Sequence, residues 1–130
     1  MAATMHVEVV SAERSVASVE ATAVFARSLD GEIGILPGHQ PALLALAIAA
    51  VKIVKDDGTE ERIAVHNGFL FFRDNKLVVL ADIAESASQI DVTRAERHMS
   101  ELERKIASEE DAAVRASIRK QQVRLSVAGR

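Results

Sequence analysis

The side chains most able to do chemistry in this chain are four histidines and a group of charged residues near the carboxyl end. The histidines, His6, His39, His66 and His98, have a spacing that matches no metal-ligand pattern. The sequence has no cysteine, no phosphate-binding glycine loop and no Ser-His-Asp order of the kind hydrolases use. We therefore expect no catalytic residue and no metal site, and we expect each histidine to be an ordinary surface or strand side chain.

The charged residues offer a binding site instead. Folding the chain back near residue 109 brings Arg94 level with Arg124 and places Lys120 one turn away on the same side. Like charges brought together repel unless an anion lies between them, and a nucleotide phosphate chain is such an anion. Glu85 and Asp91 lie close enough in sequence to accept hydrogen bonds from adenine or ribose. The alternative, on geometry alone, is a solvated charged face.

Two helices must position these residues. The first is predicted from an apolar seam with steps of three and four residues, capped by Asp91: Val92, Ala95, Met99, Leu102 and Ile106. A capping-box pattern from Ser108 to Asp111 opens the second, whose seam is Val114, Ile118, Gln121 and Leu125. These thin seams predict an antiparallel hairpin that is marginal alone and must dock or change partner.

The preceding residues, up to about 86, are expected to be β-structure. Met5, Val7 and Val9 alternate with polar residues, and turn signals at 56–59 and 73–76 separate apolar runs. The Ala/Leu-rich segment 42–50 is expected to be one strand, because its neighbours are all β. The predicted fold class is α+β: an antiparallel β-sandwich or flattened barrel over residues 1–87, then a helical hairpin domain over residues 88–130.

The composition of the chain indicates which classes of molecule it is expected to bind. The chain has 130 residues, 48% of them apolar, and its only aromatic residues are four Phe, too few for base-stacking platforms. Residues 1–90 hold seven Lys/Arg against twelve Asp/Glu, whereas residues 91–130 hold nine against seven. A mildly basic tail indicates an acidic protein partner rather than nucleic acid. No signal-peptide pattern and no apolar run of about 20 residues is present.

The segment Gly31–Pro41 carries three glycines and two prolines in eleven residues, which predicts a shaped surface loop between strands. It resembles the loop of epsilon subunits of rotary ATP synthases, whose pattern is Gly-Glu-(Ile/Leu)-Gly-x-x-Pro-Gly-His-x-Pro. The resemblance extends to Val7–Ser11, to Val78–Ala81 and to Leu125–Val127. Asn67-Gly68 stands where that family has two glycines, and both residue types suit a turn.

The resemblance implies a non-catalytic central-rotor subunit, without a cofactor, that couples proton translocation to ATP synthesis. Its implied place is peripheral, at the cytoplasmic face of the bacterial membrane. The implied partners are the gamma subunit, the ring of c subunits and, when the tail extends, the alpha and beta subunits. The residues expected at partner contacts are Glu32, Ile33, Gly34 and His39.

Residues Ile90–Ala95 are also similar to the motif Ile/Leu-Asp-x-x-Arg-Ala of family members that bind ATP. This implies ATP as a regulatory ligand that biases an inhibitory switch of the helices, held by Glu85, Asp91, Arg94, Lys120 and Arg124. Glu101 replaces a basic residue of the tightest binders, which predicts weaker binding. Two other functions remain open: a stand-alone ATP-sensing regulatory protein, and a structural adaptor with an inert helical tail.

Overall fold

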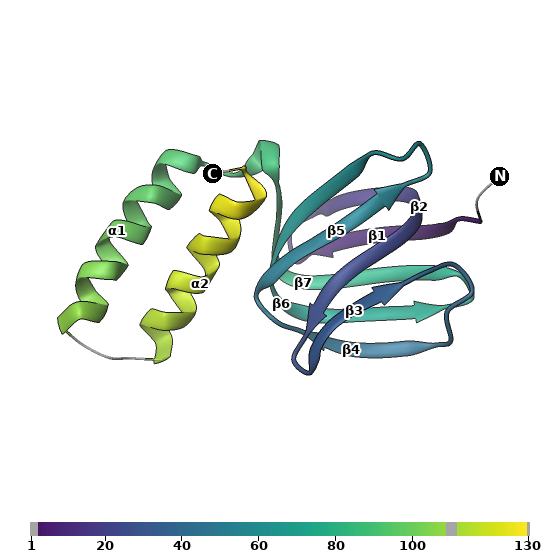
Figure 1. Cartoon of the computed structure of the whole chain (residues 1–130), viewed down its shortest axis with the longest axis horizontal. Coiled ribbons are helices and arrows are strands. Elements are labelled where there is room, and N and C mark those ends of the chain that lie inside the picture. The colour runs from purple at the N-terminus through teal and green to yellow at the C-terminus, as the bar shows by residue number, and fades with distance from the viewer. Residues whose placement is uncertain (1–2, 109–111, 130) are drawn as a thin grey trace.

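The computed structural model describes residues 3–108 and 112–129, which form seven strands followed by two helices (Figure 1). A short 3₁₀ turn, Ala87–Gln89, links the two parts. The strands are β1 (Met5–Ser11), β2 (Ser15–Ser28), β3 (Gly31–Ile35), β4 (Ala42–Leu46), β5 (Ala49–Lys55), β6 (Glu60–Arg73) and β7 (Lys76–Ser86). The helices are α1 (Val92–Ser108) and α2 (Ala112–Val127).

The strands close on themselves into a flattened barrel. β2 pairs with β1, β3, β4 and β5, and β6 pairs with β4, β5 and β7. β1 and β7 complete the circle and run parallel, whereas the other pairs among the described strands are antiparallel. The predicted α+β fold, a strand-rich sandwich followed by a helical hairpin, is confirmed, and the parallel pair is the one departure from the expected antiparallel arrangement.

Alternating apolar side chains fill the barrel. Met5, Val7 and Val9 of β1 are almost completely buried, while the residues between them are partly exposed, as the sequence pattern predicts. The largest buried side chain is Phe72, on β6, and it packs in the same cluster as Ile35 of β3. The core therefore draws on all seven described strands.

A bend in β6 sets the course of the chain around the barrel. Asn67 and Gly68 both have positive φ, 56° and 155°. Before the bend β6 pairs with β5, where Val65 lies opposite Ala49; after it β6 pairs with β4, where Gly68 lies opposite Leu46. The residues expected to form a turn therefore bend a continuous strand.

The same bend explains a wrong prediction. The segment 42–50 was expected to form one strand, but β4 ends at Leu46 and β5 begins at Ala49. Each strand pairs with a different half of β6, so the chain must change direction between them. The backbone N–H of Ala47 donates to the carbonyl of Arg27 at 2.9 Å, which satisfies a polar group at this corner.

The glycine-rich segment is also more ordered than a loop. Residues 31–35 form β3, which pairs with β2 and buries Ile35 in the core. Only the residues after Ile35 form the connection to β4, where His39 N–H donates to the carbonyl of Leu36 at 3.0 Å. The expectation of a surface loop over the whole of Gly31–Pro41 is thus wrong for its first half, because Ile35 belongs to the apolar core.

The helices lie beside the barrel in two layers. α2 packs against β5 and β6, and α1 packs on the far side of α2 (Figure 1). The carboxylate of Asp91 accepts from the N–H of Arg94 at 3.0 Å, so the predicted cap is confirmed. The side chain of Ile106 and the predicted capping box from Ser108 to Asp111 lie outside the described part of the chain.

The seams are correct in part. Ala95 and Leu102 of α1 are buried, as are Val114 and Gln121 of α2. Sequence periodicity missed a second buried face of α2, where Val123 and Val127 pack in one cluster with Ala64 of the barrel and with Ile90, which precedes α1. α2 therefore carries two contact faces, one for α1 and one for the sheet.

Candidate functional site

The predicted ligand residues meet in a cavity of about 290 Å³ between the hairpin and the end of β7. Its lining includes four of the five residues expected from the sequence: Glu85, Asp91, Arg94 and Arg124. Gln89, His98 and Gln121 complete the polar lining and were not anticipated. Gln121 was assigned to the apolar seam, and only its amide, unusual at a seam position, could have indicated a polar site.

An ion pair crosses this cavity. Arg124 Nε lies 2.6 Å from Glu85 Oε1, and the two side chains are 22% and 20% exposed. A short, partly shielded pair of this kind is stronger than an ordinary surface pair. It ties α2 to β7, and it means that the cations brought together by the hairpin already have a carboxylate among them.

Arg94 and Asp91 occupy the opposite wall. The Asp91 carboxylate caps α1, while the exposed Arg94 side chain forms no ion pair with the described residues that the structure records. Its guanidinium therefore remains available to a phosphate. The two arginines and two carboxylates of the cavity give a site with little net charge.

Lys120 is not part of the cavity lining, although it lies on the same helix one turn before Arg124. Both cations act on His66, a residue of β6 that sequence reasoning treated as unremarkable. Neither ring nitrogen of His66 has a hydrogen-bond partner among the described residues, and the side chain is fully buried. Burial, helped by the charges of Arg124 and Lys120, lowers the pKa of His66 to about 4.

His66 lies under the helical hairpin. It follows Ala64 by two positions on β6, so the two side chains share one face of the strand. Ala64 contacts the cluster formed with Val123 and Val127 of α2. A neutral imidazole is thus held at the interface between helix and sheet, and nothing in the local sequence signals it.

The residues expected at partner contacts are divided between two places. Glu32, Ile33 and Gly34 lie on β3 and line a second cavity, of about 570 Å³, between the sheet and α2. His39 does not line it; its ring meets the edge of Phe72 with centroids 5.8 Å apart. The structure therefore does not bring His39 together with the other three.

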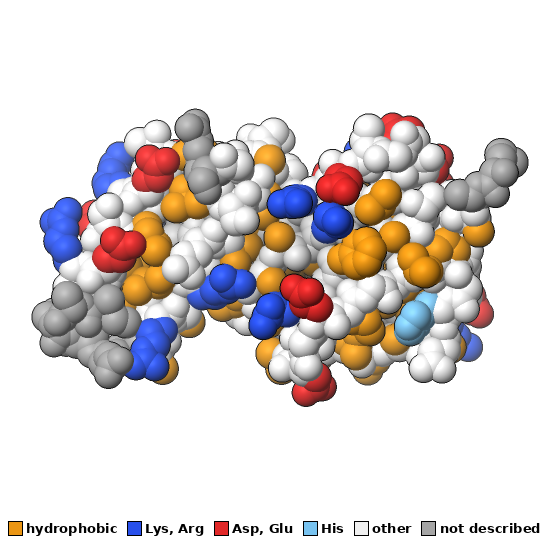
Figure 2. Space-filling model, viewed as in Figure 1, with side chains coloured by type: hydrophobic (Ala, Val, Ile, Leu, Met, Phe, Trp, Pro, Cys, Tyr) orange, Lys and Arg blue, Asp and Glu red, His pale blue; other side chains and the backbone are white. Residues whose placement is uncertain are grey.

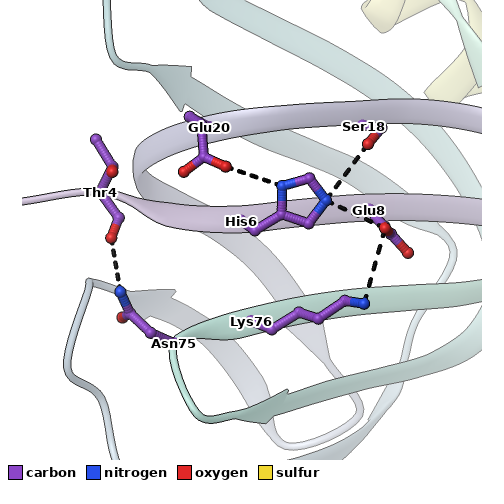
Figure 3. A network of polar contacts seen from close by, with 7 residues as sticks. All are labelled: Thr4, His6, Glu8, Ser18, Glu20, Asn75 and Lys76. Atoms are coloured by element: carbon purple, nitrogen blue, oxygen red, sulfur yellow. Dashed lines mark hydrogen bonds and ion pairs between the residues drawn. The ribbon is translucent and has the colours of Figure 1, made fainter.

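A separate polar network surrounds His6 on the outer face of β1 (Figure 3). Its ring nitrogens lie 2.9 Å from Glu20 and 3.1 Å from Glu8, and these carboxylates raise the pKa of His6. Lys76 approaches Glu8 at 3.8 Å from β7. The network links β1 to both neighbouring strands, which makes it a structural device rather than a reactive site.

The barrel also exposes a group of large apolar side chains. Leu43 lies opposite Phe71, and Phe69 lies opposite Leu80, on the outer face of β4, β6 and β7. They are 37% to 63% exposed. A contiguous exposed group of large apolar side chains usually marks a surface that contacts another molecule.

Two kinds of feature were not found in the described part of the chain. No group of three or more His, Cys, Asp or Glu side chains there is placed to hold a metal ion. No helix within residues 3–108 and 112–129 is long and apolar enough to cross a membrane.

Comparison with known proteins agrees with the fold. The sequence model of the family described as "ATP synthase, Delta/Epsilon chain, beta-sandwich domain" matches residues 4–87. The chain is 52% identical to an ATP synthase epsilon chain of Streptomyces avermitilis over 120 residues, covering 92% of this chain and 94% of that one. It is 42% identical to an epsilon chain of Brevibacillus brevis over 102 residues, covering 78% of this chain and 77% of the other.

A solved structure adds the same architecture at low identity. A chain of the Euglena gracilis mitochondrial ATP synthase, in an assembly described as OSCP/F1/c-ring, superposes with a TM-score of 0.73 at 19% identity. The match covers 98% of this chain and 78% of that one. The barrel, the hairpin and the extent of the sequence identity together show that this chain belongs to the family of ATP synthase epsilon chains.

Proposed function

We propose that the chain is a non-catalytic subunit of the central rotor of an ATP synthase, peripheral to the membrane on its cytoplasmic face. Relatives of nearly the same length are named epsilon chains, and similar folds occur in assemblies described as central stalk and c-ring. In this role it couples proton translocation to ATP synthesis by joining the gamma subunit to the ring of c subunits.

Two surfaces support the rotor contacts. The exposed apolar group of Leu43, Phe69, Phe71 and Leu80 suits a stable subunit interface, since such interfaces bury apolar and aromatic side chains. Glu32, Ile33 and Gly34 occupy β3 at another part of the barrel, and His39 lies apart from them. We therefore assign Glu32 and His39 to contacts with different partners.

We further propose that the hairpin is an ATP-sensitive switch, which inhibits ATP hydrolysis when it leaves the barrel and extends toward the alpha and beta subunits. The observation that carries this is the 290 Å³ cavity, which Arg94 and Asp91 line together with Glu85 and Arg124 at the junction of hairpin and barrel. A ligand held by both parts stabilises only the docked state. At a hundredfold excess over its dissociation constant it would favour docking by about 2.7 kcal/mol.

Calorimetric titration with ATP tests the switch directly. The wild-type chain should bind with a dissociation constant on the order of 0.1 to 1 mM, and Arg94→Ala should weaken this binding at least tenfold. Arg97→Ala is the matched control, because Arg97 is an exposed cation of the same helix and does not line the cavity. Equal affinity in wild type and Arg94→Ala would refute the proposed site.

One observation favours an inert tail instead. Arg124 is already paired with Glu85, so the docked hairpin has an internal anion and does not need a nucleotide. Fluorescent labels on α1 and the barrel distinguish the two functions. A switch requires ATP to change their separation in the wild-type chain and not in Arg94→Ala, whereas a structural adaptor shows the same separation throughout.

A further inference from the structure

The larger cavity is strongly basic. It lies on the other side of α2 from the 290 Å³ cavity lined by Glu85, Arg94 and Arg124, which is called the ATP cavity below. The volume of the larger cavity is about 570 Å³, and its charged lining consists of four cations and one carboxylate: Arg27, Lys52, Arg62, Arg119 and Glu32. Three of the cations come from the strands and Arg119 comes from α2. Figure 2 shows Lys and Arg side chains gathered where the helices meet the sheet. Docking of α2 thus adds a cation to a surface that already carries several.

Strand register places two of these cations directly opposite each other. Gly34, Phe25, Lys52 and Arg62 form one continuous row across β3, β2, β5 and β6. Neighbouring strands are about 4.8 Å apart, and like charges directly opposite on one face of a sheet are destabilising. The Lys52 and Arg62 pair is therefore costly unless an anion lies over it.

Carboxylates of the chain offset this charge only in part. Lys52 Nζ is 3.7 Å from Glu60 and 5.0 Å from the ring centre of Phe25, and Arg27 is 3.8 Å from Glu32. These are long, exposed pairs of the kind that contribute little. No ion pair is recorded for Arg62 with any other residue that the structure describes.

Helix α2 supplies one cation and two neutral side chains with hydrogen-bond donors to the cavity. Arg119 Nε donates to the carbonyl of Ile48 at 3.3 Å, which leaves the rest of its guanidinium facing the cavity. Gln122 and Ser126 of α2 also line it. Guanidinium forks together with amide and hydroxyl donors suit the several oxygens of a phosphate group.

We propose that this cavity binds an oligophosphate anion, which clamps α2 to the face of β2, β5 and β6. A singly charged anion would leave most of the positive charge uncompensated, and the volume accommodates two or three linked phosphates. The anion could be inorganic or the phosphate chain of a nucleotide. The site is separate from the ATP cavity and shares no residue with it.

Calorimetric titration of the full chain with inorganic pyrophosphate at low ionic strength tests this site. Wild type should bind with a dissociation constant of about 1 mM or tighter. Arg62→Gln, and separately Lys52→Gln, should weaken binding about tenfold, because each removes one charge-assisted contact. Arg73→Gln is the control: it removes the same charge from an 83% exposed side chain outside the cavity, and should change the affinity less than twofold.

Further arms separate this site from the ATP cavity. Arg94→Ala should bind pyrophosphate as well as wild type does, even if it has lost ATP. If ATP uses this site too, it should displace pyrophosphate from Arg94→Ala; if only inorganic anions use it, ATP should not compete there. No heat from wild type, equal losses in Arg62→Gln and Arg73→Gln, or loss of pyrophosphate binding in Arg94→Ala would each overturn the proposal.

Discussion

Arg124 illustrates how much a single side chain can do at the junction of helix and barrel. It pairs with Glu85 on β7, lines the smaller cavity and contributes to the positive field at His66. A phosphate that bound beside it would therefore compete with Glu85 for the same guanidinium. Ligand binding, docking of α2 and the protonation of His66 are linked through one residue.

Protonation of His66 should weaken the docking of α2. The pKa of His66 is about 4 in the docked state, below the ordinary value of 6.5, so the undocked state binds the proton more tightly. The contribution of neutral His66 to docking is retained above pH 6.5 and is lost as the pH falls toward 4, by about 3 kcal/mol in all and by about 1.4 kcal/mol at pH 5.5. Amide exchange of α2 at pH 7.5 and 5.5 measures this.

The matched variants are His66→Leu and His98→Gln. Leucine fills a similar volume without a titratable group, so His66→Leu should remove most of the difference between pH 7.5 and 5.5. His98 is an exposed residue of α1, and its replacement should leave the difference unchanged. An equal pH dependence in wild type and His66→Leu would show that other groups control docking.

At the scale of elements, sequence periodicity predicted what depends on local pattern. Alternation of apolar and polar residues predicted β1, and turn residues predicted the hairpins on both sides of β6. Capping chemistry predicted the role of Asp91. Sequence periodicity failed where the pairing partner decides the structure. Segment 42–50 is divided because β6 bends, and the second face of α2 is buried because the barrel lies beside it.

The candidate site shows the same limit. The sequence was enough to predict that Arg94 and Arg124 lie close together, because an antiparallel hairpin fixes which residues of its two helices lie level with each other. Lys120 is included by helical spacing, but the rotation of α2 on the barrel leaves it outside the cavity lining. Spacing alone does not fix that rotation, since Val123 and Val127 set it through contacts with β6 and Ile90.

Truncating Val123 should loosen α2 without unfolding the barrel. Val123 is 4% exposed and belongs to the small cluster that joins α2 to Ala64 and Ile90. Val123→Ala should cost about 1–2 kcal/mol of docking free energy. The control is Val114→Ala, the same change at a buried position of α2 outside that cluster.

Hydrogen exchange read at the two ends of α2 separates these variants. Val123→Ala should speed exchange over the carboxyl-terminal half of α2 and leave β6 protected. Val114→Ala should act mainly at the amino-terminal half. Unchanged exchange in Val123→Ala would mean that the ion pair of Arg124 and Glu85, rather than the apolar contact, holds the helix.

The bend of β6 should tolerate no side chain at Gly68. A Cβ atom there would lie 2.1 Å from the carbonyl oxygen of Leu80, and the φ of 155° is itself unfavourable for other residues. Gly68→Ala should therefore lower the free energy of unfolding by about 2–4 kcal/mol. Gly58→Ala, at φ 86° with open space around it, should cost only about 1 kcal/mol. Urea midpoints of the two variants provide the comparison, and equal midpoints would contradict it.

At the scale of the whole molecule, the chain is a closed barrel with a two-layered hairpin beside it. The main apolar cluster lies entirely within the barrel, whereas the hairpin contributes Val123 and Val127 to a small second cluster. The barrel has its own closed set of strand pairs, and the hairpin meets it mainly where α2 packs on β5 and β6 and where Arg124 pairs with Glu85 of β7. Stability should therefore be unequally divided between the two parts.

A fragment of residues 1–88 should fold alone. It keeps every described strand and the main core, and loses the small cluster around Ala64, the hydrogen bond of Arg119 to Ile48 and the ion pair of Arg124 with Glu85. Its circular dichroism and amide spectra should be those of a folded β-protein, with a cooperative urea transition. A spectrum of an unfolded chain would show that the hairpin is an integral part of the fold, and would remove the basis for a switch that undocks.

The parallel pair of β1 and β7 joins the first strand of the chain to the last one. During synthesis β1 leaves the ribosome early and can pair with β2. Its other edge stays unpaired until residues 76–86 have been synthesised. An open apolar edge invites pairing between nascent chains. His6 and Glu8 place polar side chains along that waiting strand, which discourages such contacts. We therefore expect the polar residues that hold β1 in the barrel to limit association between nascent chains before β7 has been synthesised as well.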